Sequence, residues 1–210
     1  TRQLDVVLLL DATGSMADEL DFLQTGLDEI AAELASLPND VSLRYGFVIY
    51  RDQAKSDSVQ VFNLTNDWAL FAENLMAVTA VGGGDYPENL NGGLSQAINS
   101  MNWNPEAVHL LILLGDAPPH LNSGEAAPLE VTLQAAAEKN ITIFTVGSDG
   151  LNETGAEIYQ QIAEVGNGRF IFVANSSEGN QINAPAVQPL TNLTHILVEI
   201  VFEVLNEEAP

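Results

Sequence analysis

Two short, almost unbroken apolar runs constrain the fold of this 210-residue chain more than any other feature. They are LDVVLLL at Leu4–Leu10 and VHLLILL at Val108–Leu114. A half-exposed strand alternates apolar and polar residues, whereas a strand buried on both faces is apolar throughout. The two runs therefore predict central strands of a parallel sheet that is covered by helices on both faces.

Helical and strand-like segments alternate along the rest of the chain. Helical spacing of apolar residues is found over 18–37, 67–76, 89–101, 128–139, 153–164 and 191–206. Short apolar segments predict strands over 42–50, 58–64, 141–146 and 169–173. A short polar loop joins the first two of these strands, which favours an antiparallel hairpin. We predict one α/β domain over 1–210: a doubly wound, mostly parallel, Rossmann-like sheet with one antiparallel edge strand. Because the chain begins three residues before the first strand, we expect this domain to belong to a larger multidomain protein.

The charge balance limits the partners that this chain can bind. Six Lys and Arg residues stand against 29 Asp and Glu residues, which gives a net charge of −23. Such a field repels nucleic acid and anionic lipids and attracts cations. No apolar run reaches the ~18 residues of a membrane span. We therefore expect neither nucleic-acid binding nor membrane insertion.

The residue composition also bears on the setting of the protein. The chain has no Cys, which excludes disulfides, thiolate metal sites and Cys nucleophiles. It is acidic and poor in Lys, and it contains five Asn-x-Ser/Thr sequons. From these features we expect an extracellular or cell-surface protein, secreted by a bacterium.

Oxygen-bearing side chains follow the two apolar runs. In an open α/β sheet, ligands bind beyond the carboxyl ends of the strands. Asp11, Thr13 and Ser15 follow the first run, Asp116 follows the second, and Glu88 lies in a glycine-rich loop between them. Carboxylate and hydroxyl oxygens suit Mg²⁺, Ca²⁺ or Mn²⁺. The sequence therefore predicts a cation site at this edge of the sheet.

Each of these residues also has an explanation without a metal. Asp11 can cap the following helix, and Thr13 and Ser15 can act as its N-caps. The glycine run at 82–84 can be a plain loop, and Pro87 suits the first turn of a helix. The occurrence of all these features together, after successive strands, favours the cation site.

The segment Asp11-Ala12-Thr13-Gly14-Ser15 resembles the metal-ion-dependent adhesion site of von Willebrand factor A domains, whose pattern is Asp-x-Ser/Thr-x-Ser. The resemblance extends from Leu4 to about Asn206. Asp85-Tyr86-Pro87-Glu88 resembles the Asp-x-Pro-Glu segment of the I-like domains of integrin β subunits. The resemblance implies that Thr13, Ser15 and Glu88 bind the metal directly, and that Asp11 and Asp116 act through water and hydrogen bonds. It also implies an open coordination position that a carboxylate of the partner fills.

The same resemblance implies two flanking Ca²⁺ sites and a moving helix. Asp18 and Glu19 correspond to an acidic pair at one flanking site, although such charges also suit a helix N-terminus. Asp52 and Asp85 correspond to ligands of the second site, where Gly83 stands in place of the usual Asn. In related domains, ligand binding slides the last helix along the body.

We expect a binding module, and no enzyme, that recognises a protein or glycan through a bound Mg²⁺ or Ca²⁺. One alternative is a structural interaction domain whose cation only holds loops together. A Mg²⁺-dependent phosphoryl-transfer hydrolase is disfavoured, because position 13 is Thr and the chain's only lysines are Lys55 and Lys139. His120 can line the rim of the site or pack within its loop, and we expect structural roles for His109 and His195.

Overall fold

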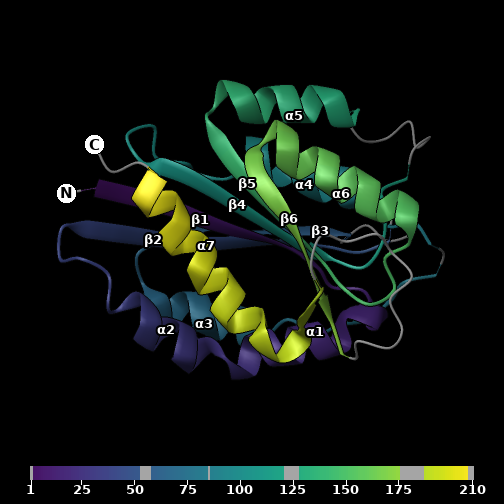
Figure 1. The fold of residues 1–210 in the computed structure, drawn as a ribbon, viewed down its shortest axis with the longest axis horizontal. Helices are drawn as coiled ribbons and strands as arrows, with labels where there is room; N and C mark the ends of the chain where they lie inside the picture. Colours follow the sequence, from purple (N-terminus) through teal and green to yellow (C-terminus); the bar gives the residue numbers. More distant parts are fainter. Residues whose placement is uncertain (1, 53–57, 85, 121–127, 176–186, 208–210) are drawn as a thin grey trace.

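The computed structural model describes residues 2–52, 58–84, 86–120, 128–175 and 187–207. Its centre is a seven-stranded sheet in the order β3-β2-β1-β4-β5-β6-β7 (Figure 1). All neighbouring strands are parallel except β2 and β3, which form the predicted antiparallel edge. The strands are β1 (Arg2–Asp11), β2 (Val41–Tyr50), β3 (Val59–Thr65), β4 (Val108–Gly115), β5 (Ile141–Gly147), β6 (Asn167–Ala174) and β7 (Val187–Pro189). The predicted fold class is confirmed.

Helices cover both faces of the sheet (Figure 1). The helices on one face are α1 (Ala17–Thr25), α2 (Leu27–Leu34), α3 (Trp68–Met76) and α7 (Leu193–Glu207). Those on the other face are α4 (Leu90–Asn99), α5 (Leu129–Glu138) and α6 (Glu153–Val165). Among the described residues, no helix has the length and apolar character that crossing a bilayer requires.

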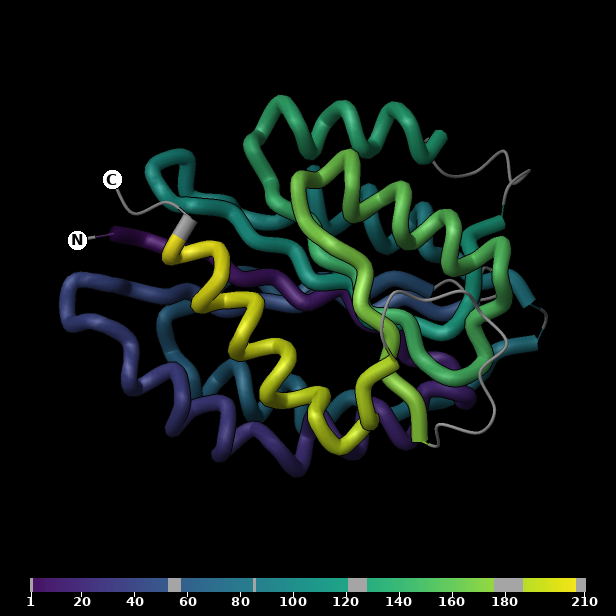
Figure 2. Tube along the Cα trace, in the orientation of Figure 1, coloured from purple at the N-terminus to yellow at the C-terminus, as the bar shows by residue number. Residues whose placement is uncertain are grey.

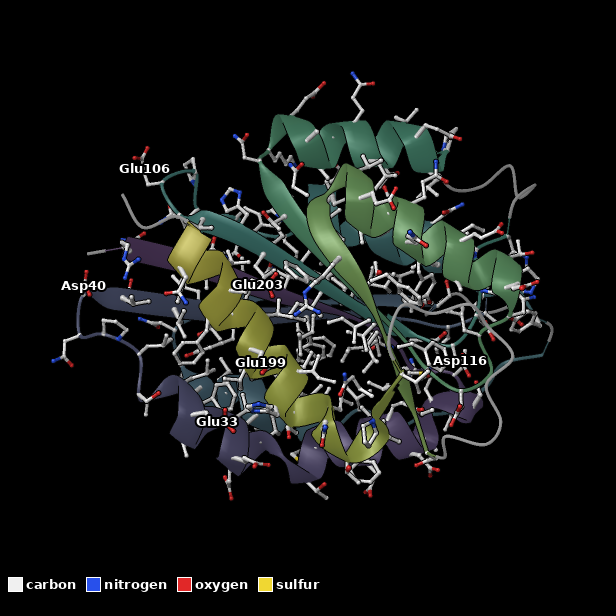
Figure 3. All side chains as sticks on the ribbon, viewed as in Figure 1. Glu33, Asp40, Glu106, Asp116, Glu199 and Glu203 are labelled. Atoms are coloured by element: carbon white, nitrogen blue, oxygen red, sulfur yellow. The ribbon has the colours of Figure 1, made fainter. Side chains whose placement is uncertain are left out.

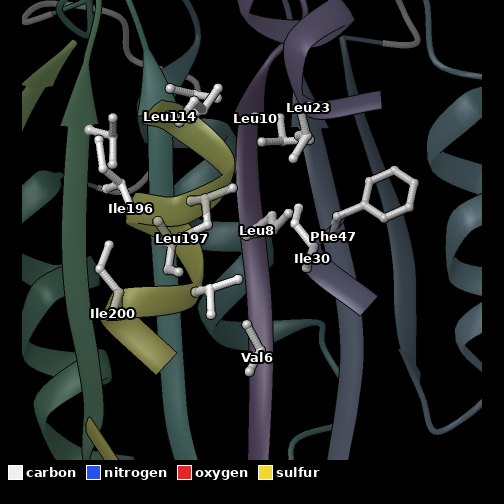
Figure 4. Close-up of a cluster of buried hydrophobic side chains, with 14 of the residues drawn as sticks. Val6, Leu8, Leu10, Leu23, Ile30, Phe47, Leu114, Ile196, Leu197 and Ile200 are labelled. Atoms are coloured by element: carbon white, nitrogen blue, oxygen red, sulfur yellow. The ribbon is translucent and has the colours of Figure 1, made fainter. Parts of the chain in front are cut away.

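The two apolar runs are central strands, as predicted. β1 lies between β2 and β4, and its side chains point alternately to the two faces. Val6, Leu8 and Leu10 enter the layer of α1, α2 and α7 (Figure 4). Val7 and Leu9 enter the layer of α4 and α6, and both are fully buried. Double-sided burial is thus the reason that the run is continuous.

Two predicted elements differ in the structure. The helix expected over 18–37 is broken into α1 and α2 at Gly26. A Cβ at Gly26 would lie 2.1 Å from Cγ2 of Thr194, so this glycine lets α7 approach closely. The short strand β7, which was not predicted, precedes the last helix, and α7 itself follows a 3₁₀ turn at Leu190–Asn192.

The chain enters and leaves the domain at the same pole, as the ends of the tube in Figure 2 show. There, Nη1 of Arg2 donates to the carbonyl oxygen of Leu205 at 3.0 Å. The loops that carry the predicted site lie at the opposite pole. In Figure 3, Asp116 lies at that pole, while Asp40 and Glu106 lie near the termini.

Candidate functional site

The turn after β1 forms the base of the site. Asp11 and Thr13 are buried, whereas Ser15 is exposed. Oδ1 of Asp11 accepts two hydrogen bonds, from the backbone N of Thr13 at 2.9 Å and from its Oγ1 at 2.7 Å. Thr13 makes no side-chain capping bond to the 3₁₀ helix that follows, and Met16, not Ser15, is the N-cap of α1. Side-chain capping therefore does not account for Thr13 or Ser15, although Thr13 occupies the N-cap position of the 3₁₀ helix and Asp11 accepts a backbone bond of the turn.

The hydroxyl oxygens of Thr13 and Ser15 lie 3.2 Å apart. A hydroxyl has one proton and a carboxylate only accepts. The Thr13 hydroxyl donates to Oδ1 of Asp11, and the Ser15 hydroxyl lies close enough to Asp116 to lower the pKa of that carboxyl. Since the Thr13 proton is directed at Asp11, Oγ1 of Thr13 keeps its lone pairs for the Ser15 hydroxyl or for a cation. Adjacent ligand oxygens around an octahedral Mg²⁺, each at about 2.1 Å from it, are about 3 Å apart. The spacing of the two hydroxyls therefore suits a shared cation.

The glycine-rich loop brings Glu88 to this turn. Backbone bonds tie the loop to the turn, from Gly14 N to the carbonyl of Gly82 at 3.0 Å and from Val81 N to that of Ala12 at 3.0 Å. A Cβ at Gly83 would lie 3.4 Å from Oε1 of Glu88 and 3.5 Å from Cβ of Thr13. The buried Glu88 carboxylate and Thr13 thus flank one glycine.

Asp116 completes the group from the end of β4. Its loop is joined to that of Glu88, because the backbone N of Glu88 donates to the Pro118 carbonyl at 3.0 Å. Asp116 is buried, which raises its pKa, and the bond from Ser15 opposes part of this rise. The structure thus brings together residues from three loops that are distant in sequence, as predicted.

Burial raises the pKa of the Asp11 and Asp116 carboxyl groups. Desolvation raises the pKa of Asp11 to about 7, and the negative charge of Asp116 adds to the rise. The hydrogen bonds from Thr13 act in the opposite direction. One oxygen of Asp11, Oδ2, is buried without a hydrogen-bond partner of normal geometry among the described residues. A nearby cation would favour the ionised form of both carboxylates.

The site relies on hydroxyl groups as much as on carboxylates. Within the described ranges, no group of three or more His, Cys, Asp and Glu side chains is placed to hold a metal ion by itself. The hydroxyl and carboxylate oxygens of Thr13, Ser15, Glu88, Asp11 and Asp116 are hard ligands of the kind that Mg²⁺ and Ca²⁺ prefer. Soft metals have no matching ligands here.

The residues of the expected flanking sites lie around this group, and the charge of Asp116 contributes to the raised pKa of Glu19. Glu19 is buried, and desolvation raises its pKa to about 7. Oδ2 of Asp18 accepts from Nδ2 of Asn175 at 3.1 Å, which ties α1 to the end of β6. Asp52 lies against the backbone of Gly84, since a Cβ there would be 3.2 Å from its Oδ2. Asp85 is outside the described residues.

The structure adds two residues that the sequence analysis missed. Nε of Arg51 donates to the Ala12 carbonyl at 3.1 Å, and its Nη2 donates to that of Thr79 at 2.9 Å. This guanidinium therefore holds the turn after β1 against the glycine-rich loop. Tyr50 is fully buried behind Asp11. Neither residue type is characteristic of a cation site, so the sequence contained no signal for them.

The three histidines take different positions. Both ring nitrogens of His109 face carbonyl oxygens, Nδ1 that of Lys139 at 2.8 Å and Nε2 that of Asn104 at 2.7 Å. This histidine joins strands and loops at the pole opposite the site. His195 lies on α7 between two glutamates of α2 and α7. His120 is half-buried in the loop after Asp116, where its carbonyl accepts from Nδ2 of Asn91 at 3.4 Å.

Comparisons with known proteins agree with this architecture. A relative, the alpha-protein kinase vwkA of Dictyostelium discoideum, is 27% identical over 118 residues, which cover 56% of this chain and 19% of that protein. The match thus spans less than a fifth of that relative's length. The solved structure of conserved hypothetical protein BatB from Bacteroides thetaiotaomicron superposes with a TM-score of 0.64 at 15% identity, and it covers 97% of this chain and 99% of that one. This likeness concerns the fold alone.

A family model described as von Willebrand factor A domain matches residues 5–175, which include both central strands and all three loops of the site. The chain therefore belongs to the von Willebrand factor A domain family.

Proposed function

We propose that this domain binds a protein or glycan partner through a divalent cation held at the carboxyl ends of β1 and β4. Domains of this family are typically protein-interaction modules and are generally not enzymes. The observation that carries the proposal is the pair of hydroxyl oxygens of Thr13 and Ser15, which lie 3.2 Å apart beside the carboxylates of Asp11 and Asp116. Two hydroxyl oxygens at this spacing can offer lone pairs to one cation.

The residues divide into direct ligands and groups that orient them. Thr13, Ser15 and Glu88 would hold Mg²⁺, Ca²⁺ or Mn²⁺ directly. Asp11 and Asp116 would act through water and through the hydrogen bonds that fix the two hydroxyls. The bound cation supplies a positive charge that attracts a carboxylate of the partner.

The negative charge of the chain explains why an acidic partner would need a bound cation. At a net charge of −23, the domain repels an acidic partner at long range. A cation at the site reverses the sign of the field locally and leaves it negative elsewhere. Recognition of a carboxylate then depends on the metal, because few cationic side chains are present to replace it.

We extend the proposal to the flanking cation sites and to the setting of the protein. The loops would work as in integrin I-like domains, with flanking Ca²⁺ at Asp18 and Glu19, and at Asp52 and Asp85. The domain would act at a bacterial cell surface or outside the cell, as part of a larger protein. These proposals rest on the resemblance of the loops and on the composition.

The phosphoryl-transfer alternative finds little support in the positions of the two lysines. Nζ of Lys139 donates to the Ile98 carbonyl at 2.7 Å, at the end of the sheet away from Asp11. Lys55 lies outside the described residues. A purely structural role for the cation differs from our proposal in one respect, since it needs no carboxylate from a partner.

Thermal unfolding of wild type and Thr13→Val, in EDTA and with Mg²⁺, Ca²⁺ or Mn²⁺, tests the cation site. Binding to the folded state stabilises it by about 2.7 kcal/mol when the cation is at 100 times its Kd. We expect this shift in wild type and its loss in Thr13→Val. Thr145→Val is the matched control, because Thr145 is also buried and its hydroxyl donates to the Tyr159 carbonyl at 3.0 Å.

Two outcomes would contradict the proposal. If cations do not stabilise wild type, there is no cation site. If Thr13→Val and Thr145→Val keep the same cation shift, the cations bind elsewhere on the acidic surface. An acidic peptide library screened with and without Mg²⁺ then separates recognition of a partner from a structural cation, because only recognition needs an open position.

A further inference from the structure

Two buried polar groups of complementary type lie next to each other behind the site. Tyr50 is the last residue of β2, and Asp11, the last residue of β1, pairs with it in the parallel register. Tyr50 is 0% exposed and Asp11 is 2% exposed. Among the described residues, neither the Tyr50 hydroxyl nor Oδ2 of Asp11 has a hydrogen-bond partner at normal distance and angle.

Gly115 leaves the space in which these groups meet. A Cβ at this position would lie 2.7 Å from the Tyr50 hydroxyl, 2.5 Å from the Tyr159 hydroxyl and 3.3 Å from Cβ of Asp11. The two hydroxyls and the aspartate therefore surround the same glycine. The Tyr159 hydroxyl donates to the Ala117 carbonyl at 3.1 Å, so its proton is already used. The Tyr50 hydroxyl therefore faces two acceptors, the Tyr159 oxygen and the Asp11 carboxylate, and the charged carboxylate is the stronger acceptor.

We propose that Tyr50 is a positioning residue, whose hydroxyl donates to Oδ2 of Asp11 and thereby holds Oδ1 in place for Thr13. This inference rests on the proposed cation site and adds a residue to it. With both oxygens of Asp11 held by donors, the carboxylate keeps one orientation. The Thr13 proton then stays directed at Asp11, and the Thr13 lone pairs stay directed at the cation.

Burial gives a physical reason for this bond. A hydroxyl and a carboxylate oxygen that are both shielded from water lose their hydrogen bonds to solvent, and one bond between them restores both. The Tyr50 hydroxyl already opposes part of the pKa rise that burial causes in Asp11. Gly115 keeps the path between them open.

The competing explanation is that Tyr50 is only a core residue. Its ring packs closely against α4, where a Cβ at Gly93 would lie 2.9 Å from Cδ1 of Tyr50. Tyr50→Phe separates the two roles, because it keeps the ring and removes the hydroxyl. Tyr45→Phe is the matched control on the same strand, since Tyr45 packs against Trp68 and Phe71, in the layer of α1, α3 and α7.

The first measurement needs no cation. In EDTA, we follow the backbone amide resonance of Thr13, whose N–H donates to Oδ1 of Asp11. We expect Tyr50→Phe to shift this resonance and to speed its hydrogen exchange, and Tyr45→Phe to leave both unchanged. An unchanged Thr13 amide in Tyr50→Phe would overturn the proposal, whether or not the domain binds a cation.

The second measurement is the Kd for Mg²⁺ and Mn²⁺ by calorimetry. We expect Tyr50→Phe to raise the Kd roughly tenfold, as for the loss of one hydrogen bond to a charged group. Its unfolding midpoint in EDTA should fall modestly, because Oδ2 of Asp11 loses its donor. A lower midpoint with an unchanged Kd would show a core role and refute the inference. A wild type that binds no cation would refute the proposed function, and an Asp11–Tyr50 bond seen in EDTA would then be purely structural.

Discussion

Asp11→Asn is expected to stabilise the cation-free domain and to abolish its response to cations. Asn keeps an oxygen that can accept both hydrogen bonds from Thr13, so the turn after β1 retains its contacts. The substitution removes a charge that is almost fully buried. A more stable protein that has lost its ligand response is the opposite of what damage to the fold would produce.

The size of this effect follows from the pKa of Asp11. Burial raises it from 3.8 to about 7, a difference of about 3 units. At 1.36 kcal/mol for each unit, the ionised group lowers the free energy of unfolding by up to about 4 kcal/mol above neutral pH. In a domain of this size that corresponds to about 10 °C in Tm. A bound cation offsets this cost in wild type but not in the variant.

The stability of the wild type should depend on pH in a direction that can be measured. Between about pH 4 and about pH 7, the folded state keeps the proton of Asp11 while the unfolded state has lost it. The stability of wild type in EDTA therefore falls as the pH rises through this window. Glu19 contributes in the same direction, because its pKa is also raised to about 7, and it does so equally in both proteins.

Urea unfolding in EDTA at several pH values, repeated with Mg²⁺, measures these differences. We expect the two proteins to be similarly stable near pH 4 and Asp11→Asn to be more stable near pH 8. Excess Mg²⁺ should raise the stability of wild type alone. If Asp11→Asn is less stable than wild type at every pH, then the charge of Asp11 is already compensated within the protein and our reasoning is wrong.

Two further substitutions test the fold. Gly26→Ala should lower the free energy of unfolding in urea by about 1–3 kcal/mol, because the added Cβ meets Thr194 of α7. This loss should exceed the gain from the higher helix propensity of Ala. An unchanged midpoint would mean that α7 moves aside freely. Arg44→Ala should lower the free energy of unfolding by about 3 kcal/mol, because the buried Asp5 carboxylate loses the guanidinium whose Nε donates to it at 2.8 Å. Asp5→Asn in the same background should recover part of this loss. If it recovers none, the effect of Arg44→Ala comes from packing.

The sequence predicted the features that depend on local periodicity. Double-sided burial requires a continuous apolar run, so β1 and β4 were predicted as central strands. Helical spacing in the same way located most of the helices. The parallel arrangement then followed from the alternation of strands and helices. Since parallel strands present their carboxyl ends at one edge, the meeting of Asp11, Thr13 and Asp116 was also predictable.

Contacts between residues that are distant in sequence were decided only by the tertiary structure. The break at Gly26 follows from the approach of Thr194, which is far away in the chain. β7 is too short for its own periodicity and exists because β6 pairs with it. The direction of the Thr13 proton, and the place of Tyr50 behind Asp11, likewise depend on packing. Periodicity reports which face of an element is buried, but it does not report which atoms of another element lie against that face.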